Sequence, residues 1–137
     1  MLKQRNPDGV PPPFSAYSLA IEAPAEARWL HISGQVGVAA DGRLAAGARG
    51  QMEQCWRNIL TILADAKMRP ADLVKVTAYL TRSEDIGLYR ELRDALLKGA
   101  KPASTLVVVA GLAHPDWLVE IEAVAAQVPP RPAYRDR

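Results

Sequence analysis

Lys101-Pro-Ala-Ser-Thr-Leu-Val-Val-Val-Ala-Gly-Leu112 is the most informative segment of this chain, and after a short turn it is followed by Leu118-Val-Glu-Ile-Glu-Ala-Val-Ala125. Branched apolar residues dominate the first segment, and the second alternates apolar and acidic residues. Short runs of this kind, bounded by turn residues, are typical of β-strands. The sequence therefore predicts two adjacent strands at the end of the domain.

Two amphipathic helices are predicted before these strands. Apolar side chains recur every three or four residues across residues 52–66 and again across residues 86–97, which is the period of one helix face. Pro70 should follow the end of the first helix, since proline cannot continue one. Ser83 is a candidate N-cap for the second helix, and Gly99 should stop it.

Further strands are predicted at residues 17–23, 29–33 and 73–80. The first two should pair as a hairpin. The third, which lies between the two helices in chain order, should be a buried strand. Asp41-Gly42 is a turn signal and nothing more. The order is ββαβαββ, so we expect an α+β fold in which two helices pack on one face of a single sheet.

Self-association is expected from the strand at residues 105–109. Its side chains are apolar or branched throughout, so the strand should be covered on both faces. Two helices cover only one face of a sheet, which leaves the other face for a second copy of the chain.

Length and composition indicate one domain. The chain has 137 residues, of which 49% are hydrophobic, enough for one core. We expect a single domain over residues 1–137, with an ordered body at about 14–128. The ends should be loose because they are rich in proline: Pro7, Pro11, Pro12, Pro13, Pro129, Pro130 and Pro132.

Charge and cysteine content exclude several classes of function. The net charge is only +2 and the basic residues are dispersed, so a nucleic-acid partner is not expected. Cys55 is the only cysteine, so neither a disulfide framework nor a metal site is expected, and no cofactor is implied. No apolar run is long enough to cross a bilayer or form a signal peptide, so we expect a cytoplasmic protein away from the membrane.

Taken together, these segments resemble the RidA family, which is YjgF-type and also labelled L-PSP endoribonuclease. The resemblance runs through Ile32-Ser-Gly-Gln-Val-Gly37, Val74-Lys-Val-Thr-Ala-Tyr-Leu80 and Val119-Glu-Ile-Glu-Ala-Val-Ala125, in that order. It implies a chorismate-mutase-like fold that assembles as a trimeric barrel. It also implies clefts between the subunits that bind a small molecule, and hydrolytic deamination of imines or enamines.

Four positions of this chain match the family's pocket. Tyr17 matches a tyrosine whose hydroxyl contacts the ligand, and Ser33 and Gly34 match the loop beside the cleft. Glu120 matches a carboxylate associated with the hydrolytic water. From the residues alone, Glu120 and Glu122 share one strand face, which could equally be a solvated face. Tyr17 could equally be a half-buried strand tyrosine with a satisfied hydroxyl.

Three positions depart from the family's pattern. Ser104 stands where the imine deaminases carry the arginine that holds the substrate carboxylate, and Leu106 stands where many members have cysteine. Arg90 replaces an asparagine that faces the pocket. Arg90 could restore the missing cation, or it could belong to a solvated helix face with Glu91, Arg93 and Asp94.

The loss of the family's arginine should weaken substrate binding. A bidentate contact between a guanidinium and a carboxylate contributes about 1.5–3 kcal/mol, and a serine hydroxyl supplies neither its charge nor its geometry. Since about 1.4 kcal/mol is tenfold in affinity, 2-imino acids should bind roughly ten to a hundredfold more weakly.

The sequence thus leaves two classes of function open. One is a RidA-like deaminase with weak activity on standard 2-imino acids, and the other is a non-catalytic trimer that binds a small metabolite or has a regulatory role. The near-neutral charge argues against a ribonuclease.

Overall fold

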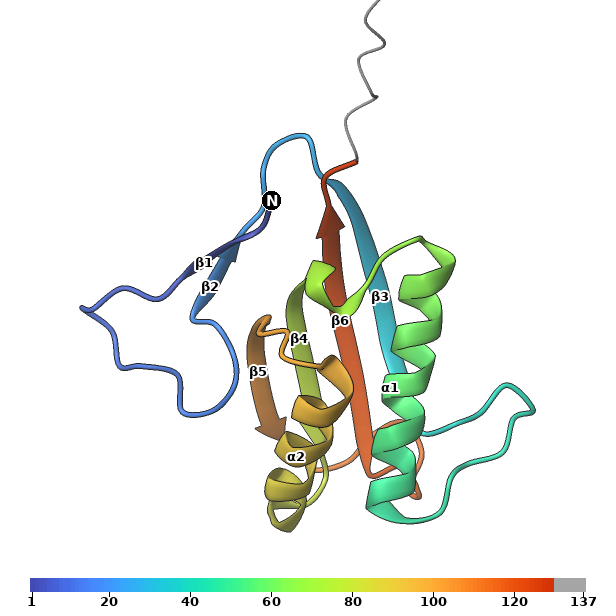
Figure 1. The fold of residues 1–137 in the computed structure, drawn as a ribbon. Helices are drawn as coiled ribbons and strands as arrows, with labels where there is room; N and C mark the ends of the chain where they lie inside the picture. The colour runs from blue at the N-terminus through green and yellow to red at the C-terminus, as the bar shows by residue number, and fades with distance from the viewer. Residues whose placement is uncertain (130–137) are drawn as a thin grey trace, which may run out of the picture.

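A four-stranded mixed sheet carries both helices on one face, and a separate two-stranded hairpin lies beside it (Figure 1). The computed structural model describes residues 1–129, so the predicted loose end at Pro130 and Pro132 lies outside the described residues. The α+β architecture with two helices on one face is as predicted. In chain order the elements are β1 (Lys3–Arg5), β2 (Ala20–Glu22), β3 (Arg28–Val36), α1 (Gly47–Asp65), η1 (Pro70–Asp72), β4 (Leu73–Leu80), η2 (Ser83–Asp85), α2 (Ile86–Leu97), β5 (Ala103–Val108) and β6 (Val119–Gln127).

The closing strands β5 and β6 both form, but they are not neighbours. The sheet order is β3-β6-β4-β5, so β4 lies between them. β4 and β5 are parallel because α2 connects them as a crossover, whereas β6 runs antiparallel to both β3 and β4. The prediction of two adjacent strands was therefore wrong in its pairing.

The predicted hairpin between residues 17–23 and 29–33 is also wrong. β2 pairs with β1, which the sequence pattern had not indicated, and β3 pairs with β6 at the edge of the main sheet. An exposed ion pair of 2.6 Å between Arg5 and Glu22 joins β1 and β2. The strand β3 finds its partner about a hundred positions along the chain, a pairing that local alternation of residues does not specify.

The helices pack their predicted apolar faces onto the sheet. α1 ends at Asp65, before Pro70 as predicted, and α2 ends where Lys98 and Gly99 adopt positive φ values of 50° and 87°. Ser83 does not cap α2 as expected, because it begins the short 3-10 turn η2 and no side-chain cap bond forms. Fully buried side chains of the two helices include Met52, Cys55, Trp56, Ile59, Leu63, Tyr89 and Leu97.

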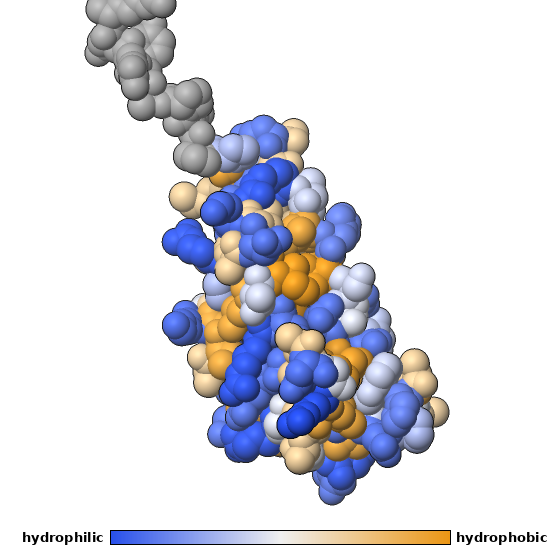
Figure 2. Space-filling model, turned by 90° about the vertical axis from the view of Figure 1, so that its right-hand side faces the viewer, coloured by the Kyte–Doolittle hydropathy of each residue, from blue (hydrophilic) through white to orange (hydrophobic). Residues whose placement is uncertain are grey.

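The sheet face opposite the helices is open in the single chain. Alternation along the strands places Lys75, Thr77 and Tyr79 of β4 on this face, and hydrophobic side chains accompany them. Val107 is 40% exposed and Trp29 is 51% exposed. Viewed from the side on which α1 lies, the surface shows hydrophobic patches interrupted by hydrophilic residues (Figure 2).

Candidate functional site

Four of the predicted site residues line one cavity of about 200 Å³ beside β5. The register of β5 with β4 pairs Ser104 with Val76 and Leu106 with Ala78, so both side chains point to the helix side of the sheet. We call this the β5 cavity, and it is lined by Phe14, Ser15, Tyr17, Arg90, Arg93, Ser104 and Leu106.

The segment that carries Tyr17 is fixed against β5 by its neighbour Ser18. The Ser18 hydroxyl donates to the carbonyl of Lys101, and the Ser18 amide donates to the carbonyl of Pro102 at 3.2 Å. Ser18 is 1% exposed, so these bonds are shielded from water. The Tyr17 hydroxyl accepts a bond from the Phe14 amide at 3.2 Å, and both residues line the cavity.

Arg93 is the more deeply buried of the two cations in this cavity. Its side chain is only 3% exposed. Its Nε and Nη2 atoms each lie 3.0 Å from Asp94 Oδ1, and Nη2 donates to the Ser15 hydroxyl at 3.3 Å. Its Cζ lies 5.8 Å from the centre of the Tyr89 ring, within range of a cation–π contact.

Arg90 lines the same cavity from one helical turn away, but it is exposed. The i, i+3 spacing puts Arg90 and Arg93 on neighbouring parts of one helix surface. The cavity therefore receives a buried and an exposed guanidinium from α2, and no carboxylate is among its lining residues.

Tyr89 lies next to Arg93, one of the residues that line this cavity. Its ring is fully buried, and its hydroxyl has no hydrogen-bond partner among residues 1–129. Burial raises the pKa of Tyr89 well above its usual range, while the nearby Arg93 charge and the Ser104 hydroxyl act in the opposite direction. Ser104 and Arg93 thus approach the same tyrosine from β5 and from α2.

Glu120 lies elsewhere, on the open face of the sheet. In β6, Val119 and Ile121 are buried toward the helices, whereas Glu120 and Glu122 are half-buried on the opposite side. The β3 register shifts between Ile32 and Gln35, so two β3 residues face one β6 residue there.

Gly34 lies in this bulge, directly against the Glu120 side chain. A Cβ placed on Gly34 would be 2.8 Å from Glu120 Cδ, closer than carbon atoms normally approach. Glycine at this position lets the carboxyl lie flat against the β3 backbone. The structure thus brings together Gly34 and Glu120, which the sequence analysis named separately as candidate site residues.

Glu122 is engaged with β4. The Tyr79 hydroxyl donates to Glu122 Oε1 at 2.6 Å. This bond to the carboxylate is the main reason that the pKa of Tyr79 is raised, and the charge of Glu120 adds to the effect. Glu122 is therefore tied within the sheet, and Glu120 is the freer of the two carboxylates.

Ser33 lines a second cavity of about 370 Å³ on the open face. Its neighbours there come from β3, β4 and β6 and are mainly polar: His31, Lys75, Thr77 and Glu122, with Ile32, Ala123 and Val124. Lys75 Nζ donates to the Thr105 hydroxyl at 2.6 Å across this face.

The predicted site residues thus form two groups within one chain. Tyr17, Arg90, Ser104 and Leu106 meet on the helix side at the β5 edge, whereas Glu120 lies with Ser33 and Gly34 on the open side near β3. Strands are about 4.8 Å apart, so β6, which carries Glu120, is roughly 10 Å from β5, and the two groups lie on opposite faces of the sheet. A site that uses both groups needs a second chain.

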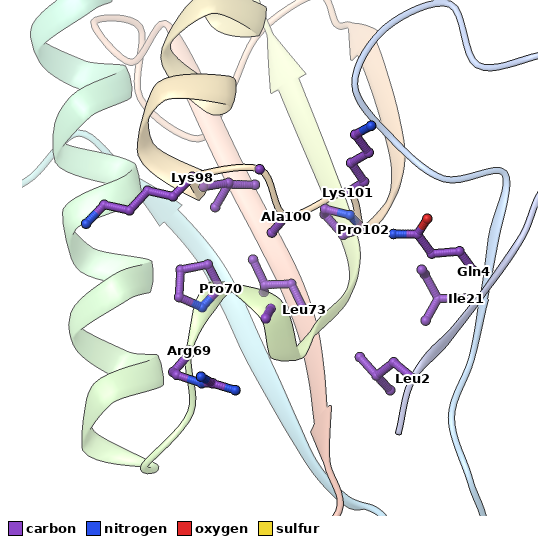
Figure 3. Close-up of a pocket in the computed structure, with 13 residues that line it drawn as sticks. Leu2, Gln4, Ile21, Arg69, Pro70, Leu73, Lys98, Ala100, Lys101 and Pro102 are labelled. Atoms are coloured by element: carbon purple, nitrogen blue, oxygen red, sulfur yellow. The ribbon is translucent and has the colours of Figure 1, made fainter.

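A larger cavity, of about 470 Å³, contains none of the predicted residues. It lies between the β1–β2 hairpin, η1 and the loop that enters β5, where Leu2 and Ile21 face Pro70 and Leu73 (Figure 3). The Gln4 amide points toward Pro102, while the Lys98 side chain extends away from the hairpin (Figure 3).

Cys55 is a core residue. It is fully buried, and its thiol lies 3.3 Å from the carbonyl oxygen of Gln35. Burial, aided by the charge of Glu120, raises the pKa of Cys55 to about 12. Residues 1–129 contain no group of three His, Cys, Asp or Glu side chains placed to hold a metal ion, and no helix within them is long and apolar enough to span a membrane.

The burial of Arg93 could have been predicted from its spacing along α2. Tyr89, Arg93 and Leu97 follow one another at four-residue spacing, and all three are buried. Arginine is seldom fully buried without partners, so the residue type indicated an exposed side chain, whereas the spacing indicated a buried one.

Comparison with known proteins identifies the family. The profile described as Endoribonuclease L-PSP matches residues 9–127. A RutC family protein of Aquifex aeolicus is 34% identical over 120 residues, which cover 85% of this chain and 93% of the relative. A 2-iminobutanoate/2-iminopropanoate deaminase of Mus musculus is 33% identical over 121 residues, which cover 87% of each chain.

The fold agrees with a solved structure of the same group. The crystal structure of YyfB from Yersinia pestis, a protein of unknown function of the conserved Rid family, matches with a TM-score of 0.83 at 33% identity. The match covers 92% of this chain and 98% of that one. The chain therefore belongs to the L-PSP endoribonuclease family, which is the family of the RidA and YjgF-type proteins.

Proposed function

We propose that the protein is a hydrolytic deaminase of a small imine or enamine, working as a homotrimer with its ligand in clefts between subunits. The observation that carries this proposal is the placement of Glu120 against Gly34, on the opposite side of the sheet from the β5 cavity. A carboxylate from one chain and a cavity from its neighbour would together form a site. The similarity to the mouse deaminase supports the choice of reaction.

In the proposed reaction Glu120 acts as the general base. It accepts a proton from a water molecule while the water oxygen forms a bond to the imine carbon, and the C=N π electrons move to nitrogen. Glu120 returns this proton to nitrogen, which gives a carbinolamine. It then takes the proton of the new hydroxyl and passes it to the amino group, so the C–N bond breaks and ammonia leaves as the C=O bond forms. A partly desolvated carboxylate is suited to such proton transfer.

Tyr17 and Ser104 orient the ligand in this proposal, Ser33 and Gly34 border it, and Leu106 gives the cleft an apolar wall. Because Ser104 lacks a charge, we expect weak activity on standard 2-imino acids compared with the mouse relative.

The alternative is a trimer that binds a small metabolite without reacting with it. One observation favours it, namely that the residues lining the β5 cavity include two arginines but no carboxylate or histidine to act as a base. In this case the cleft would have a regulatory or storage role, and Glu120 would be a polar residue of the interface.

The two functions are separated by an imine hydrolysis assay. A dehydratase generates 2-iminobutanoate in the presence of the protein, and the release of 2-oxobutanoate is followed with the mouse deaminase as reference. We expect release above the uncatalysed rate but roughly tenfold or more below the reference. A rate equal to the reference would contradict the weakened anchor, and no acceleration would favour the binding function.

A further inference from the structure

We infer that Arg93 is the anion-binding residue of the β5 cavity, and that the cavity takes a small molecule with a carboxylate group. The inference deepens the proposed function, since it names the ligand class of the same site. The charge arrives from α2 instead of from position 104 on β5, and its pairing with Asp94 makes it a weaker anchor than the arginine of the imine deaminases, in keeping with the weak activity expected above.

The first support is that the Arg93 guanidinium is buried and incompletely bonded. A guanidinium has five N–H donors. The bonds to Asp94 and Ser15 use Nε and Nη2, and within residues 1–129 no bond reaches Nη1. Nη1 is not among the fully buried atoms that lack a partner, so its N–H groups are accessible and can donate to an anion in the cavity that Arg93 lines.

The second support is the charge of the cavity. Two guanidinium groups line it, and its other lining residues are uncharged. In a partly enclosed space, these charges attract an anion more strongly than they would in water. Asp94, the ionic partner of Arg93, is 49% exposed and is not among the lining residues, so it neutralises Arg93 from outside the cavity.

The third support is the small side chain of Ser104. Arg93 lies with its Cζ 5.8 Å from the centre of the Tyr89 ring. The Ser104 hydroxyl is also close to Tyr89, since both Arg93 and Ser104 oppose the rise in its pKa. A guanidinium on β5 at this position would meet the one on α2, and like charges at close range are destabilising. The serine leaves that space to a ligand anion that reaches Arg93.

Calorimetry with 2-oxobutanoate tests the inference without depending on turnover. 2-Oxobutanamide, which has the same shape without the charge, serves as the control ligand. We expect Arg93→Gln to weaken 2-oxobutanoate binding roughly ten to a hundredfold while leaving the amide unaffected. Arg57→Gln, at an exposed arginine of α1 outside the cavity, is the control and should leave 2-oxobutanoate binding unchanged.

A second variant keeps the test valid if Arg93→Gln fails to fold. Asp94→Asn removes the competing carboxylate from an exposed position and should tighten 2-oxobutanoate binding about threefold or more. Unchanged or weaker binding in Asp94→Asn, undiminished binding in folded Arg93→Gln, or no binding by the native protein would each overturn the inference. Binding of 2-oxobutanoate through Arg93 without imine hydrolysis would sustain the inference and defeat the proposed deaminase.

Discussion

Gly34 and Glu120 are in contact across the β3–β6 pair, and the carboxyl of Glu120 rests on the backbone of Gly34. The space between them is too small for a methyl group, since a Cβ on Gly34 would be 2.8 Å from Glu120 Cδ and 3.0 Å from its Cγ. The clash involves the end of a flexible side chain, so it can be relieved by moving Glu120 alone. Gly34 therefore sets the position of the carboxylate.

Gly34→Ala should displace Glu120 while leaving the fold intact. We expect the free energy of unfolding to change by about 0.5 kcal/mol, as for an exposed position, and imine hydrolysis to fall about tenfold or more. Chemical denaturation and the 2-oxobutanoate assay measure the two effects. The matched control is Gly37→Ala, whose Cβ would lie 2.6 Å from the Cα atom of Gln51 in α1. Backbone cannot yield as a side chain does, so this variant should lose about 1–3 kcal/mol. Equal stability losses in the two variants would contradict this difference.

Glu120→Gln should remove the general base but keep the shape of the side chain. Hydrolysis of 2-iminobutanoate should fall by roughly 10²–10⁴-fold in kcat, with a smaller change in KM. Glu122→Gln is the control, since Glu122 lies on the same strand face but is bonded to Tyr79 at 2.6 Å. If Glu122→Gln lost as much activity as Glu120→Gln, the effect would belong to the sheet face as a whole and not to one base.

The open face of the sheet should be the surface through which chains associate. Val107 is on this face beside Tyr79 and is 40% exposed in the single chain. Sedimentation should give a trimer for the native protein, and Val107→Asp should shift it to monomers because burying an unpaired carboxylate is costly. Val10→Asp, at a valine of the N-terminal segment that is 49% exposed, should leave the trimer unchanged. A native monomer would overturn the proposed shared cleft.

The buried thiol of Cys55 should make stability fall at alkaline pH. Its pKa is raised from 9.0 to about 12, so between these values the unfolded chain loses a proton that the folded chain keeps. Stability from this group is thus complete below pH 9 and is lost as the pH rises toward 12. From pH 8 to pH 10, the free energy of unfolding should fall about 1.4 kcal/mol more for the native chain than for Cys55→Ala.

Denaturation curves at the two pH values measure this difference. The thiol should also resist alkylation at pH 8 in the folded protein and react once denaturant unfolds it. Rapid alkylation of the folded protein would show that the thiol is accessible and that its pKa is not raised.

The helices were predictable from the sequence because their signals are local. The three- and four-residue spacing in α1, followed by Pro70, and the left-handed Lys98-Gly99 pair after α2 each act within a few residues. Strand pairing is not local. Neither the partnership of β3 with β6 nor the position of β4 between β5 and β6 can be inferred from alternation within one strand.

The strand β1 was not predicted, for a related reason. Its sequence, Lys3-Gln4-Arg5, has no apolar alternation, and all three residues are exposed. β1 forms because its backbone pairs with β2, and this pairing depends on where the chain reverses direction between the two strands.

The candidate site was only half predictable. Tyr17 and Ser104, which the resemblance to the family named as site residues, lie together in the β5 cavity. Arg93 was not predicted as a site residue, although its spacing from Tyr89 matches the buried face. The separation of Glu120 from Ser104 depends on the sheet order, which no single segment encodes.

The tether between Ser18 and Lys101 has a consequence for how the protein is made. It joins positions 83 residues apart, and it holds the segment that forms one wall of the β5 cavity. Contacts of such long range form late, because the intervening chain must first lose its freedom. During synthesis the cavity cannot form until β5 has emerged from the ribosome. For most of translation the segment around Tyr17 is therefore without its partner strand.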